Sequence, residues 1–286
     1  MVEIKELRSI ELSSFTIIST AIAVLFSIIS AILISILIAL LMPAGSSVII
    51  YLIPTIVVGA FMFGIYNFFS EGLLYNLLAK KLKTVAVAIN DGKEIVKIST
   101  TETATMVSII LTIQVILFYL VSVLVLPLLL STAMQTLMFS GQQAMAYSIY
   151  QLLIVISQPV TIGIVIFGTF IISFVFVLLG TYIYNFLAKK GRGIVLNLND
   201  ENGLTSIESI DSLKLAIAFA IISGLLGLIF GVIMVFSGAP IATALGNILT
   251  GFVGGFIEAY LVALFYNFLA PKLGKLKIEL IDYKIN

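Results

Sequence analysis

The chain has 286 residues, of which 61% are hydrophobic and 10% are charged, and its net charge is +1. Soluble domains carry about 25% charged residues, so this composition predicts an integral membrane protein. The chain has no cysteine and no histidine, which excludes disulfides, thiolate chemistry and the commonest general base and metal ligand. We therefore expect no catalytic residue, no metal and no cofactor, and the nearly neutral charge gives no case for a nucleic-acid partner.

Three long apolar blocks follow a short charged opening segment, MVEIKELRSIELSS, which we expect to be retained because the apolar run after it is longer than a signal-peptide core. Residues 12–70 and 103–188 contain no charged side chain, and 215–270 contain only Glu258. Each block is long enough for two crossings and is interrupted by turn residues. These are Pro43-Ala44-Gly45-Ser46 and Pro54, then Ser140-Gly141 and Pro159, then Ser237-Gly238-Ala239-Pro240. We predict transmembrane helices over 14–41, 54–80, 104–130, 159–188, 213–236 and 248–270.

The basic residues indicate the orientation of these helices. All fifteen Lys and Arg residues lie before the first predicted helix, at or between the facing ends of the second and third, at or between those of the fourth and fifth, or after the sixth. The outer connections carry no charge. By the positive-inside rule we expect a multi-pass protein of the cell membrane with both termini in the cytoplasm.

A sixteen-residue phrase occurs three times, beginning at Leu74, Ile183 and Phe265. Its fixed part is a Tyr-Asn pair followed, after one residue, by Leu-Ala: Tyr75-Asn76, Tyr184-Asn185 and Tyr266-Asn267. Basic residues and then a run with period-2 alternation follow each pair, which predicts a half-buried strand. A second phrase, an apolar residue with Ser or Thr and an acid (Glu11, Glu102 or Asp211), precedes each odd-numbered helix and is suited to cap it. We interpret the chain as three tandem repeats, over 1–90, 91–199 and 200–286.

The predicted strands form a set that can close. Asn90-Asp91-Gly92-Lys93 predicts a hairpin between strands 85–89 and 94–98, and Asn199 to Gly203 occupies the same place in the second loop. The first strand, 3–10, and the last, 275–281, lack hairpin partners, and pairing them would remove both exposed edges. We therefore expect an all-α polytopic membrane protein, with six helices as three parallel two-helix repeats around a pseudo-threefold axis, above a small cytoplasmic six-stranded sheet or barrel. The outer insertion 131–158, rich in Gln and Met, is interpreted as an interfacial helix that either caps the bundle or docks another membrane subunit.

The repeated motif, clearest at 184–198, resembles an uncharacterised two-helix transmembrane domain of actinobacteria and archaea, in which a helix pair ends in Tyr-Asn, a small residue, glycines and a strand. The resemblance covers each repeat and hence most of the chain. Repeat 1 departs from it, with Leu82 and Thr84 where repeat 2 has Gly191 and Gly193. This resemblance implies an architecture and no reaction.

The Tyr-Asn pairs lie at the inner ends of the even-numbered helices, and two interpretations stay open. A threefold arrangement would make the asparagines a ring of amide oxygens that constricts a path or coordinates an ion. Alternatively, each Asn satisfies free carbonyls where a helix becomes a strand, while the Tyr anchors at the interface.

Glu71 and Glu258 are the only acids inside the predicted helices, and Asn67 lies one turn before Glu71. At 1.5 Å per residue, Glu258 lies about 20 Å from Lys272, near the middle of a hydrocarbon core about 30 Å thick. A carboxyl at that depth is a candidate proton or Na⁺ site, although repeat 2 has no matching acid. The other interpretation is a neutral, buried structural carboxyl.

Two small-residue motifs, Gly227-xxx-Gly231 and Gly251-xxx-Gly255, are typical of close helix packing. With little polar machinery in the bilayer, the sequence favours a non-catalytic scaffold or a subunit of a membrane assembly. The alternative is an ion-coupled transporter or channel that uses Glu258 and Glu71. The expected partners are the lipid bilayer and other membrane-protein subunits, and the inner lysines Lys80, Lys81, Lys189 and Lys190 are suited to anionic lipid headgroups.

Overall fold

The computed structural model describes residues 2–41, 49–201 and 203–283. Within them, six helices are long and apolar enough to cross a membrane, which confirms that the chain is compatible with a multi-pass membrane protein. They are α1 (Leu12–Leu41), α2 (Ile49–Leu78), α3 (Thr100–Phe139), α5 (Pro159–Ala188), α6 (Ser212–Phe236) and α7 (Ile241–Leu273). A shorter helix, α4 (Gln143–Ser157), joins α3 to α5. The predicted turn at Pro43-Ala44-Gly45-Ser46, together with Asn202 and Lys284, lies outside the described residues.

Three predicted helix boundaries were wrong. Pro54 lies inside α2, which begins at Ile49, and α7 begins at Ile241 instead of 248. Membrane helices tolerate an internal proline, and Pro54, close to the start of α2, removes only one backbone hydrogen bond, the one that the Ile50 carbonyl would accept. The third is the end of α3, which was predicted at 130 and lies at Phe139. The insertion 131–158 is therefore not one helix, because its first part belongs to α3, and Gly141, with a φ of 79°, separates α3 from α4.

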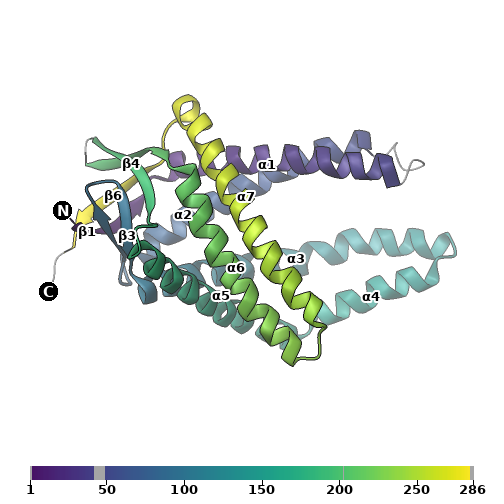
Figure 1. Cartoon of the computed structure of the whole chain (residues 1–286). Helices are drawn as coiled ribbons and strands as arrows, with labels where there is room; N and C mark the ends of the chain where they lie inside the picture. Colours follow the sequence, from purple (N-terminus) through teal and green to yellow (C-terminus); the bar gives the residue numbers. More distant parts are fainter. Residues whose placement is uncertain (1, 42–48, 202, 284–286) are drawn as a thin grey trace. The chain divides into compact units, whose positions relative to one another are not determined.

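Six strands form a closed barrel in which every neighbouring pair is antiparallel (Figure 1). They are β1 (Val2–Ile10), β2 (Val85–Asn90), β3 (Glu94–Ile98), β4 (Ile194–Glu201), β5 (Leu204–Ile210) and β6 (Lys277–Asp282). The first strand pairs with the last, with Lys5 opposite Asp282 and Ile10 opposite Ile278. The prediction that these two strands close the set is therefore confirmed.

The two hairpins of the barrel are formed as their turn residues predict. Asp91 and Gly92 join β2 to β3 with φ angles of 48° and 67°, and Gly203, with a φ of 81°, lies between β4 and β5. Positive φ angles are accessible to Gly and, at small cost, to Asp, so these residues permit the tight reversal.

Helix starts and helix ends connect the barrel to the apolar helices. Glu11 accepts a 2.8 Å hydrogen bond from the Ser14 amide, and Asp211 accepts one of 3.0 Å from the Lys214 amide, so both acids cap a helix as predicted. Glu102 instead lies inside the first turn of α3. Under the barrel, a buried cluster joins α1 and α7 to the strands: Ile18, Tyr266 and Ala270, with Ile22, Ile207, Ile210, Leu269 and Leu276 around them.

The chain divides into two compact units. One comprises residues 1–106 and 178–286 and contains the barrel, α1, α2, α6 and α7. The other, residues 107–177, contains the remaining parts of α3 and α5 and all of α4. Within this second unit the Tyr119 hydroxyl donates to the Ile156 carbonyl, which ties α3 to α4.

Candidate functional site

The asparagine of each Tyr-Asn pair binds the last residue of a strand. Asn76 accepts from the Ile10 amide and donates to the Ile10 carbonyl, both at 2.8 Å. Asn185 makes the same two bonds with Ile98, and Asn267 makes them with Ile210, again at 2.8 Å. Each side-chain amide thus satisfies both backbone groups of one residue at the end of β1, β3 or β5. These backbone groups lie where the strand gives way to the next helix, and backbone groups removed from water require a hydrogen-bond partner.

The tyrosines are buried and their hydroxyls bind strand backbone. Tyr75, Tyr184 and Tyr266 are at most 6% exposed. They donate to the carbonyls of Leu7, Ile95 and Ile207 at 2.6, 2.5 and 2.5 Å. The Tyr184 hydroxyl also accepts from the Ile194 amide at 3.1 Å, and that of Tyr266 accepts from the Leu276 amide at 3.2 Å. These two hydroxyls therefore connect the strand before a helix pair to the strand after it.

The two acids of the apolar helices lie in different surroundings. Glu71 is half-buried on α2, next to Gly72, which packs against Leu12 and Phe15 of α1. Glu258 is exposed on α7. Within the part of the chain that the structure describes, neither carboxylate makes a hydrogen bond or an ion pair, and no such bond joins one to the other. Asn67 lies on α2, one turn before Glu71.

The glycine motifs lie where α6 and α7 pack against each other. A Cβ at Gly227 would lie 2.5 Å from the Asn247 carbonyl oxygen, and one at Gly231 would lie 2.8 Å from the Ala244 Cα. On the facing helix, a Cβ at Gly251 or Gly255 would lie within 2.7 Å of an oxygen atom of Ser223. Real Cβ atoms do not approach backbone that closely, so Gly227, Gly231 and Gly251 require glycine at the observed helix separation, whereas the atoms nearest to Gly255 belong to the Ser223 side chain.

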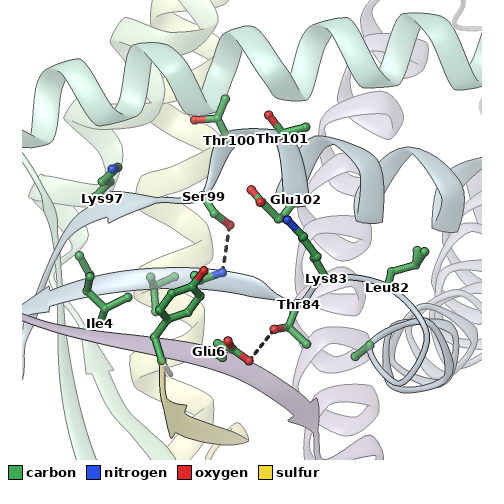
Figure 2. A pocket seen from close by; sticks show the side chains of 15 residues that line it. Ile4, Glu6, Leu82, Lys83, Thr84, Lys97, Ser99, Thr100, Thr101 and Glu102 are labelled. Atoms are coloured by element: carbon green, nitrogen blue, oxygen red, sulfur yellow. Dashed lines mark hydrogen bonds between the residues drawn. The ribbon is translucent and has the colours of Figure 1, made fainter. Parts of the chain in front are cut away.

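A cavity of about 850 Å³ was not expected from the sequence. It lies beside the barrel and is lined by parts of β1, β2 and β3, by the connection from α2 to β2 and by the start of α3 (Figure 2). It includes neither Glu71 nor Glu258. The sequence feature that could have indicated this cavity is the pair Ala86 and Ala88. When the three phrases are aligned, the other two have larger side chains at these two positions.

The chemistry available at these sites is limited. Among residues 2–41, 49–201 and 203–283, no group of three Asp or Glu side chains is placed to hold a metal ion. Comparison of the chain with protein-family models, with curated proteins and with solved structures finds no match.

Proposed function

We propose that this protein is a non-catalytic scaffold, or a subunit of a membrane assembly, in the cell membrane. The observation that carries the proposal is the use made of the Tyr-Asn corners. All three asparagine amides bind strand backbone and all three tyrosine hydroxyls do the same, so these polar groups hold the barrel to the helices. Because these amides and hydroxyls are already hydrogen-bonded to strand backbone, the arrangement favours a rigid platform over an ion-coordinating ring.

We further propose that the chain consists of three tandem two-helix repeats of the type found in the uncharacterised actinobacterial and archaeal domain. Recurrence of the same hydrogen bonds at Asn76, Asn185 and Asn267, with partners 66, 87 and 57 residues away, supports this. The barrel and both termini would then lie in the cytoplasm. In support, Lys80, Lys189 and Lys272 all lie at the barrel ends of membrane-spanning helices.

The platform would act by presenting a closed sheet on one side of the membrane and apolar helices within it. A closed barrel has no free strand edge, so partners would bind its side chains and loops or the helices, not its backbone. Many large apolar side chains are exposed on the helices, as lipid or a membrane subunit requires.

The test is purification of the tagged full-length protein from native membranes in a mild detergent, with quantitative mass spectrometry of the proteins retained. We expect one or more membrane partners at fixed stoichiometry. A parallel preparation from cells with an untagged copy is the control. A monodisperse protein with no stoichiometric partner would argue against a scaffold.

Ion-coupled transport is the second candidate, and the acids carry it. A carboxyl within a membrane-spanning helix is costly, and Glu258 and Glu71 have no partner among the described residues to lower that cost. Proton and Na⁺ flux into proteoliposomes would be compared for the wild type, Glu258→Gln and Glu71→Gln. Ion flux that is lost in Glu258→Gln supports transport. If the wild-type protein shows no flux, the transport hypothesis is contradicted.

A further inference from the structure

The cavity beside the barrel is formed by one face of three adjacent strands. Ile4 lies opposite Ala88 across β1 and β2, and Glu6 lies opposite Ala86. Ala88 in turn lies opposite Lys97 of β3. Since alternate residues of a strand point to the same side, these side chains share a face, and all of them line the cavity. The start of α3 and the connection after α2 form its other walls (Figure 2).

Two alanines make this face hollow. Counted from the Tyr-Asn pairs, the positions of Ala86 and Ala88 are taken by Val195 and Asn197 in β4, and by Lys277 and Glu279 in β6. The longer side chains would extend over the sheet where the two methyl groups leave it open. A volume of about 850 Å³ falls in the range of pockets that hold small molecules, about 300–1,000 Å³.

The charges in the cavity are balanced and largely unpaired. Lys83 and Lys97 supply two ammonium groups, and Glu6 and Glu102 supply two carboxylates. Glu6 accepts a 2.9 Å hydrogen bond from the Thr84 hydroxyl. Within the described residues, the other three charged groups make no hydrogen bond or ion pair. Figure 2 shows Lys83 and Lys97 on the two sides of the segment from Ser99 to Glu102.

The hydroxyl groups of the cavity add neutral donors. Thr100 and Thr101 belong to its lining, beside Lys97 and Glu102. Ser99 is already engaged, because its hydroxyl accepts from the Ala86 amide at 2.9 Å. A ligand that carried only negative charge would meet two cations and two carboxylates. A ligand that carries both a phosphate and an ammonium group meets a complement for each.

The position of the cavity along the chain indicates where such a ligand comes from. The membrane-spanning helix α2 ends at Leu78, and α3 begins at Thr100, so the cavity lies between the ends of two such helices. Phospholipid headgroups occupy this level of a bilayer. Leu82 and Ala79, from the end of α2, supply apolar surface beside the charged groups.

We propose that this cavity binds the headgroup of a zwitterionic phospholipid that carries a primary ammonium. Lys83 and Lys97 bind the phosphate, and Glu102 binds the ammonium. A trimethylated ammonium has no N–H to donate to the carboxylate, and a headgroup without an ammonium, such as that of phosphatidylglycerol, leaves Glu102 unpaired. The site therefore distinguishes phosphatidylethanolamine from phosphatidylcholine and phosphatidylglycerol. The proposal stands whether the protein is a scaffold or a transporter.

The experiment is native mass spectrometry of the purified full-length protein, titrated in detergent with each of these three lipids. We expect the wild type to retain phosphatidylethanolamine, and Lys83→Gln and Lys97→Gln each to weaken its binding about tenfold, as loss of one charge-assisted hydrogen bond implies. Lys93→Gln is the matched control, because it removes a charge from the turn between β2 and β3 but lies outside the lining. Ala86→Val, which installs the side chain found in β4, narrows the cavity at its strand face and should reduce binding without altering any charge.

Thermal unfolding of each variant shows whether it is folded, and weaker lipid binding is interpreted only for variants that are folded. Equal binding of the three lipids, or equal binding by wild type, Lys83→Gln, Lys97→Gln and Ala86→Val, would overturn the proposal. Free phosphoethanolamine provides the last arm. If it binds and phosphatidylethanolamine does not, the headgroup chemistry is right but the ligand is a soluble metabolite, and the lipid assignment is wrong.

Discussion

Replacement of Gly251 by alanine tests the close approach of α6 and α7. The new Cβ would lie 2.5 Å from the Ser223 carbonyl oxygen and 2.9 Å from the carbonyl carbon. Both atoms belong to the backbone of α6, so the clash is relieved only if the helices separate. A separation of about 0.5–1 Å forfeits a quarter to a half of the dispersion energy of each contact along the interface.

The expected cost follows from two opposing terms. Overpacking a tight site costs about 1–3 kcal/mol. Alanine also has a higher helix propensity than glycine, which returns up to about 1 kcal/mol. We therefore expect Gly251→Ala to lower the free energy of unfolding by up to about 2 kcal/mol, and by about 1–3 kcal/mol relative to a glycine-to-alanine variant that gains only the propensity.

Gly254→Ala is the matched control, three residues further along the same helix. No atom lies within 4 Å of the Cβ that it would add, so only the propensity term applies and this variant should be unchanged or slightly stabilised. The measurement is equilibrium unfolding in mixed micelles with increasing SDS, followed by circular dichroism. If Gly251→Ala proved as stable as Gly254→Ala, the packing argument for α6 and α7 would be refuted.

Three further predictions concern the corners, a helix cap and the orientation. Asn185→Ala leaves the backbone N–H and C=O of Ile98 without their partner, so thermal unfolding should show a loss of about 1–3 kcal/mol, and an unchanged midpoint would contradict the corner role. Burial raises the pKa of Glu11, but hydrogen bonds from Ser13 and Ser14 outweigh this and hold the pKa below its ordinary value of 4.5. Its stabilising effect is therefore present above pH 4.5 and is lost as the pH falls through the depressed value. Unfolding of Glu11→Gln should depend less on pH in that acid range, and parallel curves would exclude the effect. Because the chain has no cysteine, Lys93→Cys and Gln143→Cys can be probed singly with a membrane-impermeant maleimide in intact cells. We expect labelling at position 143 and protection at position 93, and the reverse pattern would invert the proposed topology.

The barrel was predictable because strand patterns are local. Alternation with period 2 at 85–89 and the Asn-Asp-Gly turn indicate strands and their reversal without reference to the rest of the chain. Closure followed from the two strands that had no hairpin partner. Helix boundaries were less predictable, because a segment that is apolar all round has no polar face whose end marks the end of the helix. The starts of α2 and α7, predicted at 54 and 248, therefore lie at Ile49 and Ile241 instead.

The candidate sites were predictable only as far as side-chain type. The sequence marks Asn76 as special but does not show that its partner is Ile10, 66 residues away. Glu258 lies eight residues before Tyr266, which is two turns and a further rotation of about 80° around the helix, so Glu258 is exposed while Tyr266 is buried. The cavity depends on what is missing at Ala86 and Ala88, and an absent side chain is visible only by comparison with β4 and β6.

The pairing of β1 with β6 has a consequence for the synthesis of the protein. Of the six strands, β1 (residues 2–10) is made first and its partner β6 (residues 277–282) is made last. At about 20 residues per second, β1 leaves the ribosome on the order of ten seconds before β6 exists. Throughout that interval one edge of β1 is unpaired while the apolar helices enter the membrane. Ribosome-bound chains that stop before residue 277 therefore carry an open sheet, and chaperone binding or protease sensitivity of β1 should end only when the last strand is released.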